Sequence, residues 1–281
     1  MTTHRPELHF VPEDGVLDAP AGILRDGDTW HLFYQYRPTA DSPARWGHTY
    51  SEESPFDWLD CDDVLAPVGG ELSLRAGSVA QGPDDIHLYF TSVTAAGIAV
   101  HLARYADADE ICEVSDDPQA LDPNVVRFGE VVGNTRNFDH FRSPSVVPDW
   151  ASEDRDDGHD GWLMLAVSGP VTAPKPVVLT STDGRDWHLV GPLTFDGDTG
   201  VDLDASLVAP RLVRLRDEVD GEIHDVLFIT LERDGKDTAV YAVGQLNGSV
   251  FRVDTPFSFA RDAGLPVRWT RTRARLASRC A

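Results

Sequence analysis

The chain repeats one short structural plan four times, and this repetition limits its possible folds more than any other feature. Each copy has a strand of small residues, a turn containing Gly, Asp or Pro, and then an apolar strand; the copies span 19–36, 75–93, 142–169 and 208–232. This pattern predicts β-hairpins. Helical periodicity is scarce in the rest of the sequence. We therefore expect an all-β protein.

Hairpins that recur at intervals of roughly 55 to 70 residues favour the blades of a β-propeller. Four blades are evident, and a fifth, incomplete blade could combine the segment around Leu8 to Val11 with the segment from Phe251 onward. A two-sheet sandwich remains the alternative, because strand spacing does not exclude it. The absence of a linker rich in Ser, Gly or Pro predicts one domain over residues 1–281.

The C-terminal residues 263–281 differ from the rest of this predicted domain. They contain no acid and crowd five arginines into RWTRTRARLASR. This basic tail is either a terminal strand or the product of an altered reading frame or chain end.

Composition restricts the partners of the chain. Its 47 acidic and 24 basic residues give a formal net charge of −23, which disfavours nucleic acid and anionic membranes. Its apolar content of 41% is sufficient for a substantial core. The N-terminus has no signal-peptide pattern, and no apolar run is long enough to span a membrane, so we expect a cytoplasmic protein.

The cysteines and histidines suggest no cofactor or metal. Cys61, Cys112 and Cys280 are an odd number without CxxC spacing, which disfavours both a disulfide framework and a zinc site. The histidines show no spacing typical of metal ligands, and four of them are interpreted as structural: His31, His48, His87 and His140.

An ordered series of motifs resembles glycoside hydrolase family 32, the five-bladed β-propellers that include invertases and levanases. The series runs RPELHFVPEDG, HLFYQYRP, WGHTYS, RAGSVA, FRSPSVV, VAPRLV and YAVGQLNGSVF. The order is specific, whereas each motif alone is weak. The resemblance covers most of the chain and implies a fructoside-like substrate in the propeller funnel.

The three acidic residues of the family are replaced in this sequence. By resemblance, Ala19 of GVLDAPAG stands at the nucleophile, Ser143 at the aspartate that stabilises the transition state, and Val208 at the general acid. Retaining glycosidases need a nucleophilic carboxylate and a general acid on either side of the scissile bond. We therefore predict a non-hydrolytic protein that binds a furanoside.

Two other functions remain open. Asp18, Asp139 and Asp204 lie near the vacated positions, so an active glycosidase could use relocated carboxylates. A one-residue shift along a regular strand, however, directs a side chain to the opposite face, and four extended residues span about 13 Å. The other alternative is a protein-interaction platform with a vestigial funnel.

Several side chains retain the means to bind a sugar without chemistry. By resemblance, the residues that line the pocket are Asp18, Gln35, Trp46, Ser78, Arg142 and Ser143. Structural roles are the alternatives: Trp46 packs between blades, Gln35 satisfies backbone groups, Ser78 is a strand residue, and Arg142 pairs with Asp18. The sequence does not predict the oligomeric state.

Overall fold

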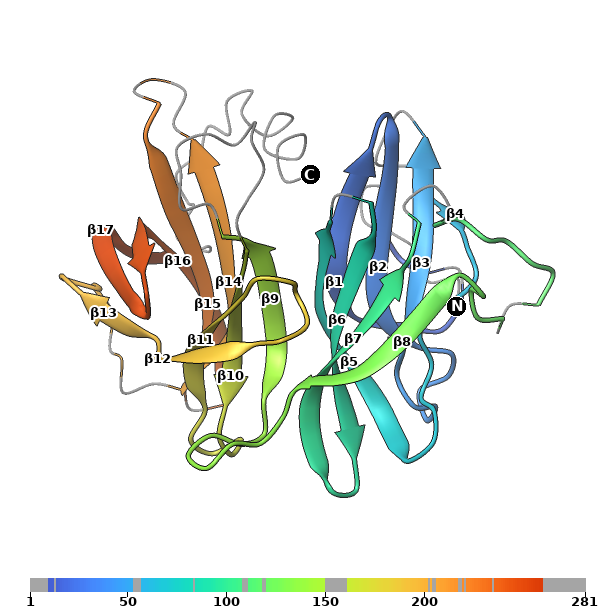
Figure 1. Ribbon diagram of the computed structural model, residues 1–281, viewed down its shortest axis with the longest axis horizontal. Helices are drawn as coiled ribbons and strands as arrows, with labels where there is room; N and C mark the ends of the chain where they lie inside the picture. Colours follow the sequence, from blue (N-terminus) through green and yellow to red (C-terminus); the bar gives the residue numbers. More distant parts are fainter. Residues whose placement is uncertain are drawn as a thin grey trace. The chain divides into compact units, whose positions relative to one another are not determined.

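The computed structural model contains four β-sheets and describes most of the chain (Figure 1). The described residues are 10–12, 14–52, 57–82, 84–107, 111–117, 120–149, 161–201, 203, 206–216, 219, 221–233 and 235–259. Contacts divide the chain into two compact units, with the boundary between Gly129 and Glu130. The single domain expected from the sequence stays a prediction.

The first unit contains two antiparallel sheets of four strands each. One has the order β1 (Val16–Asp26), β2 (Thr29–Arg37), β3 (Arg45–Glu52) and β4 (Leu59–Asp60). The other has the order β5 (Glu71–Gln81), β6 (Ile86–Thr94), β7 (Gly97–Tyr105) and β8 (Val125–Val132), and the unit boundary falls within β8. Each sheet is a meander, because its neighbouring strands are consecutive in sequence.

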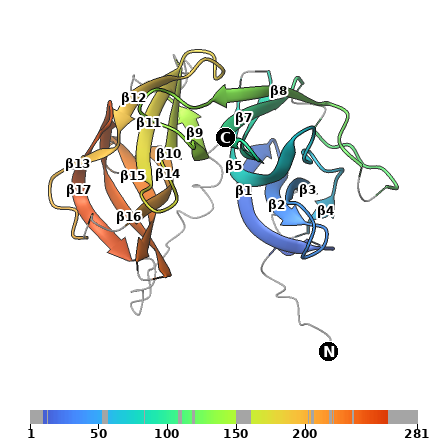
Figure 2. The same ribbon diagram turned by 90° about the horizontal axis from the view of Figure 1, so that it is seen from below.

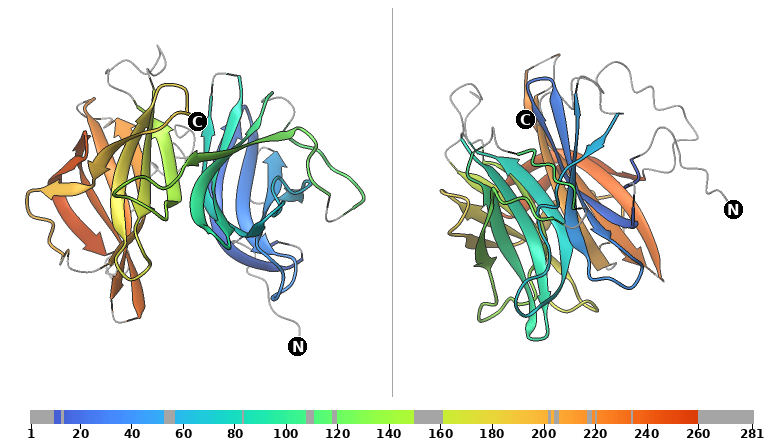
Figure 3. Two further views of the ribbon diagram at one scale, coloured as in Figure 1. Left: turned by 60° about the horizontal axis from the view of Figure 1, so that its bottom comes forward. Right: turned by 90° about the vertical axis from the view of Figure 1, so that its right-hand side faces the viewer.

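The second unit also contains two sheets. One has the order β12 (His188–Pro192), β11 (Lys175–Ser181), β10 (Trp162–Ser168) and β9 (Arg142–Pro148). The other has the order β13 (Thr194–Asp196), β17 (Val250–Phe259), β16 (Lys236–Asn247), β15 (Ile223–Arg233) and β14 (Ser206–Arg216), with β13 parallel to β17. Figure 3 shows that the sheets twist strongly, as expected for β-sheets.

Apolar runs form β6 and β10 because these two strands are covered on both faces. All seven residues Trp162–Ser168 of β10 are buried, as are the first seven residues of β6. In the first unit, the core contains Phe33, Trp46 and Phe90 among other side chains. Burying a side chain of this size contributes about 1.5–3 kcal/mol, so these runs are the main source of stability in each sheet.

The first strands of the sheets pack together within each unit. Strand β1 contacts β5 in the first unit, and β9 contacts β14 in the second (Figure 2). Close packing of β1 on β5 requires a glycine, since a Cβ on Gly22 would lie 2.8 Å from the Cβ of Val79. The first strands, which carry the four sequence motifs, therefore contact one another in pairs.

The prediction of an all-β fold with four hairpin-based blades is confirmed. The expected use of Phe251 onward in a fifth blade is wrong for residues up to Phe259, because β17 completes the sheet of β14 to β16. The other residues assigned to that blade fall largely outside the described part, as does the whole basic tail 263–281. Within the described part, no helix has the length and apolar character needed to cross a membrane.

Candidate functional site

Each first strand contains a β-bulge at its sequence motif. In three of them, two residues oppose one residue of the neighbouring strand: Ala76–Gly77, Ser143–Pro144 and Ala209–Pro210. In β1, Asp18 is the extra residue between the pairs Leu17–Tyr36 and Ala19–Gln35. Bulges disrupt regular pairing and redirect side chains. The four motifs therefore form irregular strand segments, which explains why their sequences are rich in small residues.

The bulge in β1 brings Asp18 to the same face as Ala19. Asp18 accepts a hydrogen bond from Gln35 Nε2 at 3.1 Å and bonds from Arg37 Nε and Nη2 at 3.0–3.2 Å. Gln35 and Arg37, two residues apart in β2, share one face, and Ala19 lies opposite Gln35. The expectation that Asp18 points away from the face of Ala19 is therefore wrong, because it assumed a regular strand.

Gln35 joins the two bulges of the first unit. Its Nε2 donates to Asp18, and its Oε1 accepts a hydrogen bond from the backbone nitrogen of Ala76 at 2.6 Å. The Asp18 carboxylate is 21% exposed and the Arg37 side chain 32% exposed, so this pair is partly open to solvent. The structural role considered for Gln35 is thus present, beside a partly accessible carboxylate.

Arg211 joins the bulges of the second unit in a similar way. Its Nη1 donates to the carbonyl oxygens of Ser143 and Pro144 at 3.3 and 3.1 Å. Burial lowers the pKa of the Arg211 guanidinium to about 10. Ser143 and Ala209 adopt left-handed backbone conformations, with φ of 55° and 48°. Such conformations are costly for residues other than glycine and occur at functional sites.

Arg142 is buried at the start of β9, with only 7% of its surface exposed. Its Nη1 donates to the carbonyl oxygens of His140 and Gly169, at 3.0 and 2.6 Å. These bonds compensate part of the desolvation of the guanidinium. Asp18, which the sequence offered as a partner for Arg142, has Arg37 as an ionic partner.

Two further predicted binding residues, Trp46 and Ser78, are also buried. Trp46 is 0% exposed, and its Nε1 donates to the carbonyl of Arg75 at 3.2 Å, so the packing role accounts for it. Ser78 is 9% exposed at the end of the β5 bulge. Val208, at the general-acid position by resemblance, is half-buried opposite Thr230.

Of the other two candidate carboxylates, the structure describes Asp139 but not Asp204. Asp139 precedes β9, and its side chain is 53% exposed. The chain is not extended between Asp139 and Ser143, since His140 and Ser143 have φ of 53° and 55°, so the extended-strand distance does not apply. Asp204 lies outside the described residues.

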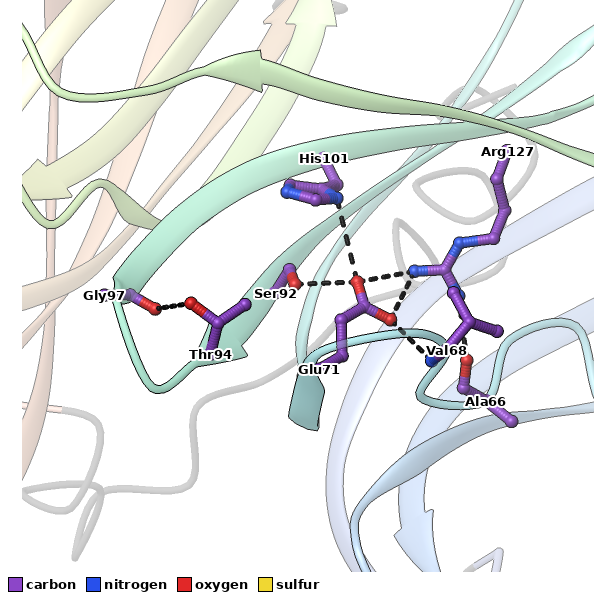
Figure 4. Close-up of polar contacts among 8 residues, drawn as sticks. All are labelled: Ala66, Val68, Glu71, Ser92, Thr94, Gly97, His101 and Arg127. Carbon is purple, nitrogen blue, oxygen red and sulfur yellow. Dashed lines mark hydrogen bonds and ion pairs between the residues drawn. The ribbon is translucent and has the colours of Figure 1, made fainter.

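A charged cluster in the first unit is centred on the carboxylate of Glu71 (Figure 4). Glu71 accepts two bonds from Arg127 at 2.7 Å, one from the hydroxyl of Ser92 at 2.7 Å, and one from the backbone nitrogen of Val68 at 2.9 Å. His101 Nδ1 lies 3.7 Å away. The carboxylate is therefore fully engaged, and the cluster connects all four strands of its sheet.

His31 and His48, two of the histidines interpreted as structural, are buried and contact each other. His31 Nδ1 and His48 Nε2 are 3.0 Å apart, and the ring of His48 stacks on Phe33. Burial lowers the pKa of His31 to about 4 and that of His48 well below its usual value. Both rings are thus neutral near pH 7. Among the described residues, no group of three or more His, Cys, Asp or Glu side chains could hold a metal ion.

The first unit also contains an acidic cavity of about 260 Å³. Its lining includes Tyr36, Asp62 and Asp63. Asp63 is paired with Arg45 at 2.6 Å and accepts hydrogen bonds from the Tyr36 hydroxyl at 2.8 and 3.0 Å. Burial raises the pKa of Asp63 to about 7. This cavity could not be predicted from the sequence, because its residues come from separate segments.

Together, the blade-like sheets and their bulged first strands define a β-propeller protein. Solved structures with this fold include a fructofuranosidase of Schwanniomyces occidentalis complexed with fructose, with a TM-score of 0.66 at 20% identity. That alignment covers 91% of this chain and 49% of the other. A β-fructofuranosidase of Bombyx mori gives a TM-score of 0.63 at 22% identity, with 91% and 52% covered.

The chain belongs to glycoside hydrolase family 32, because the model of the family's N-terminal domain matches residues 9–264. Sucrose-6-phosphate hydrolase of Bacillus subtilis is 26% identical over 205 residues, covering 71% of this chain and 39% of the relative. Invertase 2 of Saccharomyces cerevisiae is 25% identical over 263 residues, covering 89% and 46%. The chain thus spans less than half the length of these relatives.

Proposed function

We propose that this chain is a non-hydrolytic member of its family that binds a furanoside. The proposal is carried by the residues Ala19, Ser143 and Val208, which by motif resemblance stand at the three positions where the family has its catalytic acids. Alanine cannot form a glycosyl ester, and valine has no proton to donate. General acid catalysis alone contributes about 10²–10⁴ to a rate, and without a nucleophile the covalent glycosyl-enzyme intermediate of a retaining glycosidase cannot form.

Polar groups suitable for a sugar remain at the bulge of β1. Asp18 offers a partly exposed carboxylate and Gln35 a carboxamide. These groups exchange hydrogen bonds with sugar hydroxyls. A fructofuranosidase of similar fold is known in complex with fructose. We therefore propose a fructoside-like ligand for the same surface of this chain.

A specific observation also favours a second function, an active glycosidase in which Asp18 replaces the lost nucleophile. The bulge places its carboxylate on the face of Ala19, where the family's nucleophile stands by resemblance. Against this function, donors from Arg37 and Gln35 contact both oxygens of Asp18. An ion pair of this kind stabilises the carboxylate and reduces its tendency to attack an anomeric carbon.

Ligand binding and turnover should be measured together on the purified chain. Binding is followed by the melting temperature and by calorimetric titration with fructose, sucrose and short fructans. Turnover is followed by sugar release from sucrose, fructans and aryl furanosides. The variants are Asp18→Asn, Asp139→Asn and Asp204→Asn. Asp28→Asn is the matched control, since Asp28 is 89% exposed in a hairpin turn and pairs with neighbouring Arg25.

The proposal predicts saturable binding that Asp18→Asn weakens and Asp28→Asn does not, with no sugar release above the buffer rate. Release that disappears in Asp18→Asn or another of the three test variants would establish the glycosidase instead. If no sugar binds and none is released, both proposals fail, and the interaction platform becomes the explanation to test.

A further inference from the structure

Two cysteines that are distant in sequence meet beside the acidic cavity. Cys61 and Cys112 are 51 residues apart, and their Sγ atoms are 3.2 Å apart. Cys61 follows β4 and is half-buried, whereas Cys112 is exposed. A disulfide bond is about 2.05 Å long, so the sulfurs would have to approach by only about 1 Å.

The backbone holds the two cysteine-containing segments in register. The backbone nitrogen of Asp62 donates to the carbonyl of Glu113 at 2.8 Å, one residue after each cysteine. Further along, the nitrogen of Asp63 donates to Ala120, and the nitrogen of Asp122 donates to Asp63, at 3.1 and 2.9 Å. Neighbouring strands lie about 4.8 Å apart, which falls within the Cα separations that disulfides span.

A side-chain contact fixes the same pair of segments. Asp62 Oδ1 accepts hydrogen bonds from both the backbone nitrogen and the hydroxyl of Ser115, each at 2.9 Å. Cys61 itself is anchored on its other side, because its backbone nitrogen donates to the carbonyl of His48 at 3.0 Å. The thiols are thus positioned by their neighbours in both segments, and no large backbone movement is needed to join them.

We propose that Cys61 and Cys112 are a thiol–disulfide modification site that low-molecular-weight disulfides oxidise. The exposed Cys112 thiolate attacks one sulfur of the small disulfide, which forms a mixed disulfide and releases one thiolate. Cys61 then loses its proton and attacks Cys112 Sγ, forming the intramolecular bond and releasing the second thiolate. The two released thiolates take up the two protons, and two electrons pass from the cysteines to the small disulfide.

The electrostatics of the pair agree with this order of attack. The hydrogen bond from the Cys61 thiol lowers the pKa of Cys112. The same bond, together with burial, raises the pKa of Cys61. The thiolate is the nucleophilic form of cysteine, so the exposed Cys112 is the first to react.

The bond would fix one wall of the acidic cavity. Cys61, Val114, Ser115, Asp116 and Asp117 line this cavity. A link between Cys61 and Cys112 joins the two segments that supply these residues. Oxidation therefore adds a covalent restraint to a cavity wall that backbone hydrogen bonds already hold in register.

The test is oxidation of the native full chain by glutathione disulfide, followed by non-reducing peptide mapping and intact-mass measurement. We expect a Cys61–Cys112 linked peptide and loss of the mass of two hydrogen atoms. The melting temperature should rise by about 5–10 °C, since the bond closes a long loop of the unfolded chain. A reducing thiol should reverse both changes.

Three variants make the test specific. Cys280→Ser should form the same link, which shows that the third cysteine is not required. Cys61→Ser should leave Cys112 as a persistent mixed disulfide with glutathione, and Cys112→Ser should abolish the reaction at the pair. A link to Cys280 in place of Cys61–Cys112, or a Cys61–Cys112 link that forms only in denaturant, would overturn the proposal.

Discussion

Asp63 provides a quantitative test of the electrostatics around the acidic cavity. Its side chain is only 6% exposed, and burial raises its pKa from 3.8 to about 7, although Arg45 and Tyr36 act in the opposite direction. Because the folded-state pKa lies above the unfolded value, the native state binds more protons between these two pH values. The free energy of unfolding contributed by this group therefore falls as pH rises through about 4 to 7.

The magnitude follows from the size of the shift. One pKa unit corresponds to about 1.4 kcal/mol, so a shift from 3.8 to about 7 corresponds to roughly 4 kcal/mol at most. The variant Asp63→Asn lacks the titrating group and keeps an acceptor for the Tyr36 hydroxyl. Relative to this variant, the wild type should lose up to roughly 4 kcal/mol as pH rises from about 4 to 8.

Urea denaturation of both proteins at several pH values measures this difference, and the comparison cancels the titration of the other acids. A difference that does not change with pH would refute the raised pKa. A wild type that gains on the variant as pH rises would show that the Arg45 ion pair outweighs burial.

Two further substitutions test the packing and the ionic pairing. Asp225→Ala should lower the free energy of unfolding by about 1–3 kcal/mol, because it removes the 3.0 Å ion pair from Arg214 and the acceptor of the Leu246 backbone nitrogen, while Asp149 still pairs with Arg214 at 2.9 Å. An unchanged urea midpoint would contradict this. Gly22→Ala should cost about 1–3 kcal/mol, since the new Cβ would meet Val79 at 2.8 Å. The control Gly70→Ala faces open space and should stay within about 0.5 kcal/mol, so equal urea midpoints for the two alanine variants would contradict the packing argument.

The parts of the fold that depend on local sequence could be predicted. The turn at 25–28 and the apolar run at 29–36 are neighbours in sequence, so the hairpin of β1 and β2 was predictable from alternation and turn residues. The pairing of the strand that begins near Phe251 could not be predicted in the same way. No feature of the local sequence shows that β17 pairs with β16 rather than belonging to a separate blade.

The candidate site was predicted only in part, because its geometry depends on irregular and distant contacts. In a regular strand, successive side chains alternate between the two faces of the sheet. The bulge at Asp18 breaks this alternation, so the sequence pattern predicts the wrong face for Asp18. Arg37 and Arg211 were not singled out, since their partners belong to other segments. Likewise, the spacing of Cys61 and Cys112 in sequence gave no indication that they are in contact.

The central claim is that replacement of the family's acids has ended hydrolysis, and the rate of fructose release from sucrose tests it most directly. The assay should use a high concentration of the purified wild-type chain, with Asp18→Asn prepared in the same way beside it. Our account predicts that both proteins release fructose no faster than buffer alone. Release by the wild type that Asp18→Asn abolishes would contradict the account and identify Asp18 as a relocated nucleophile.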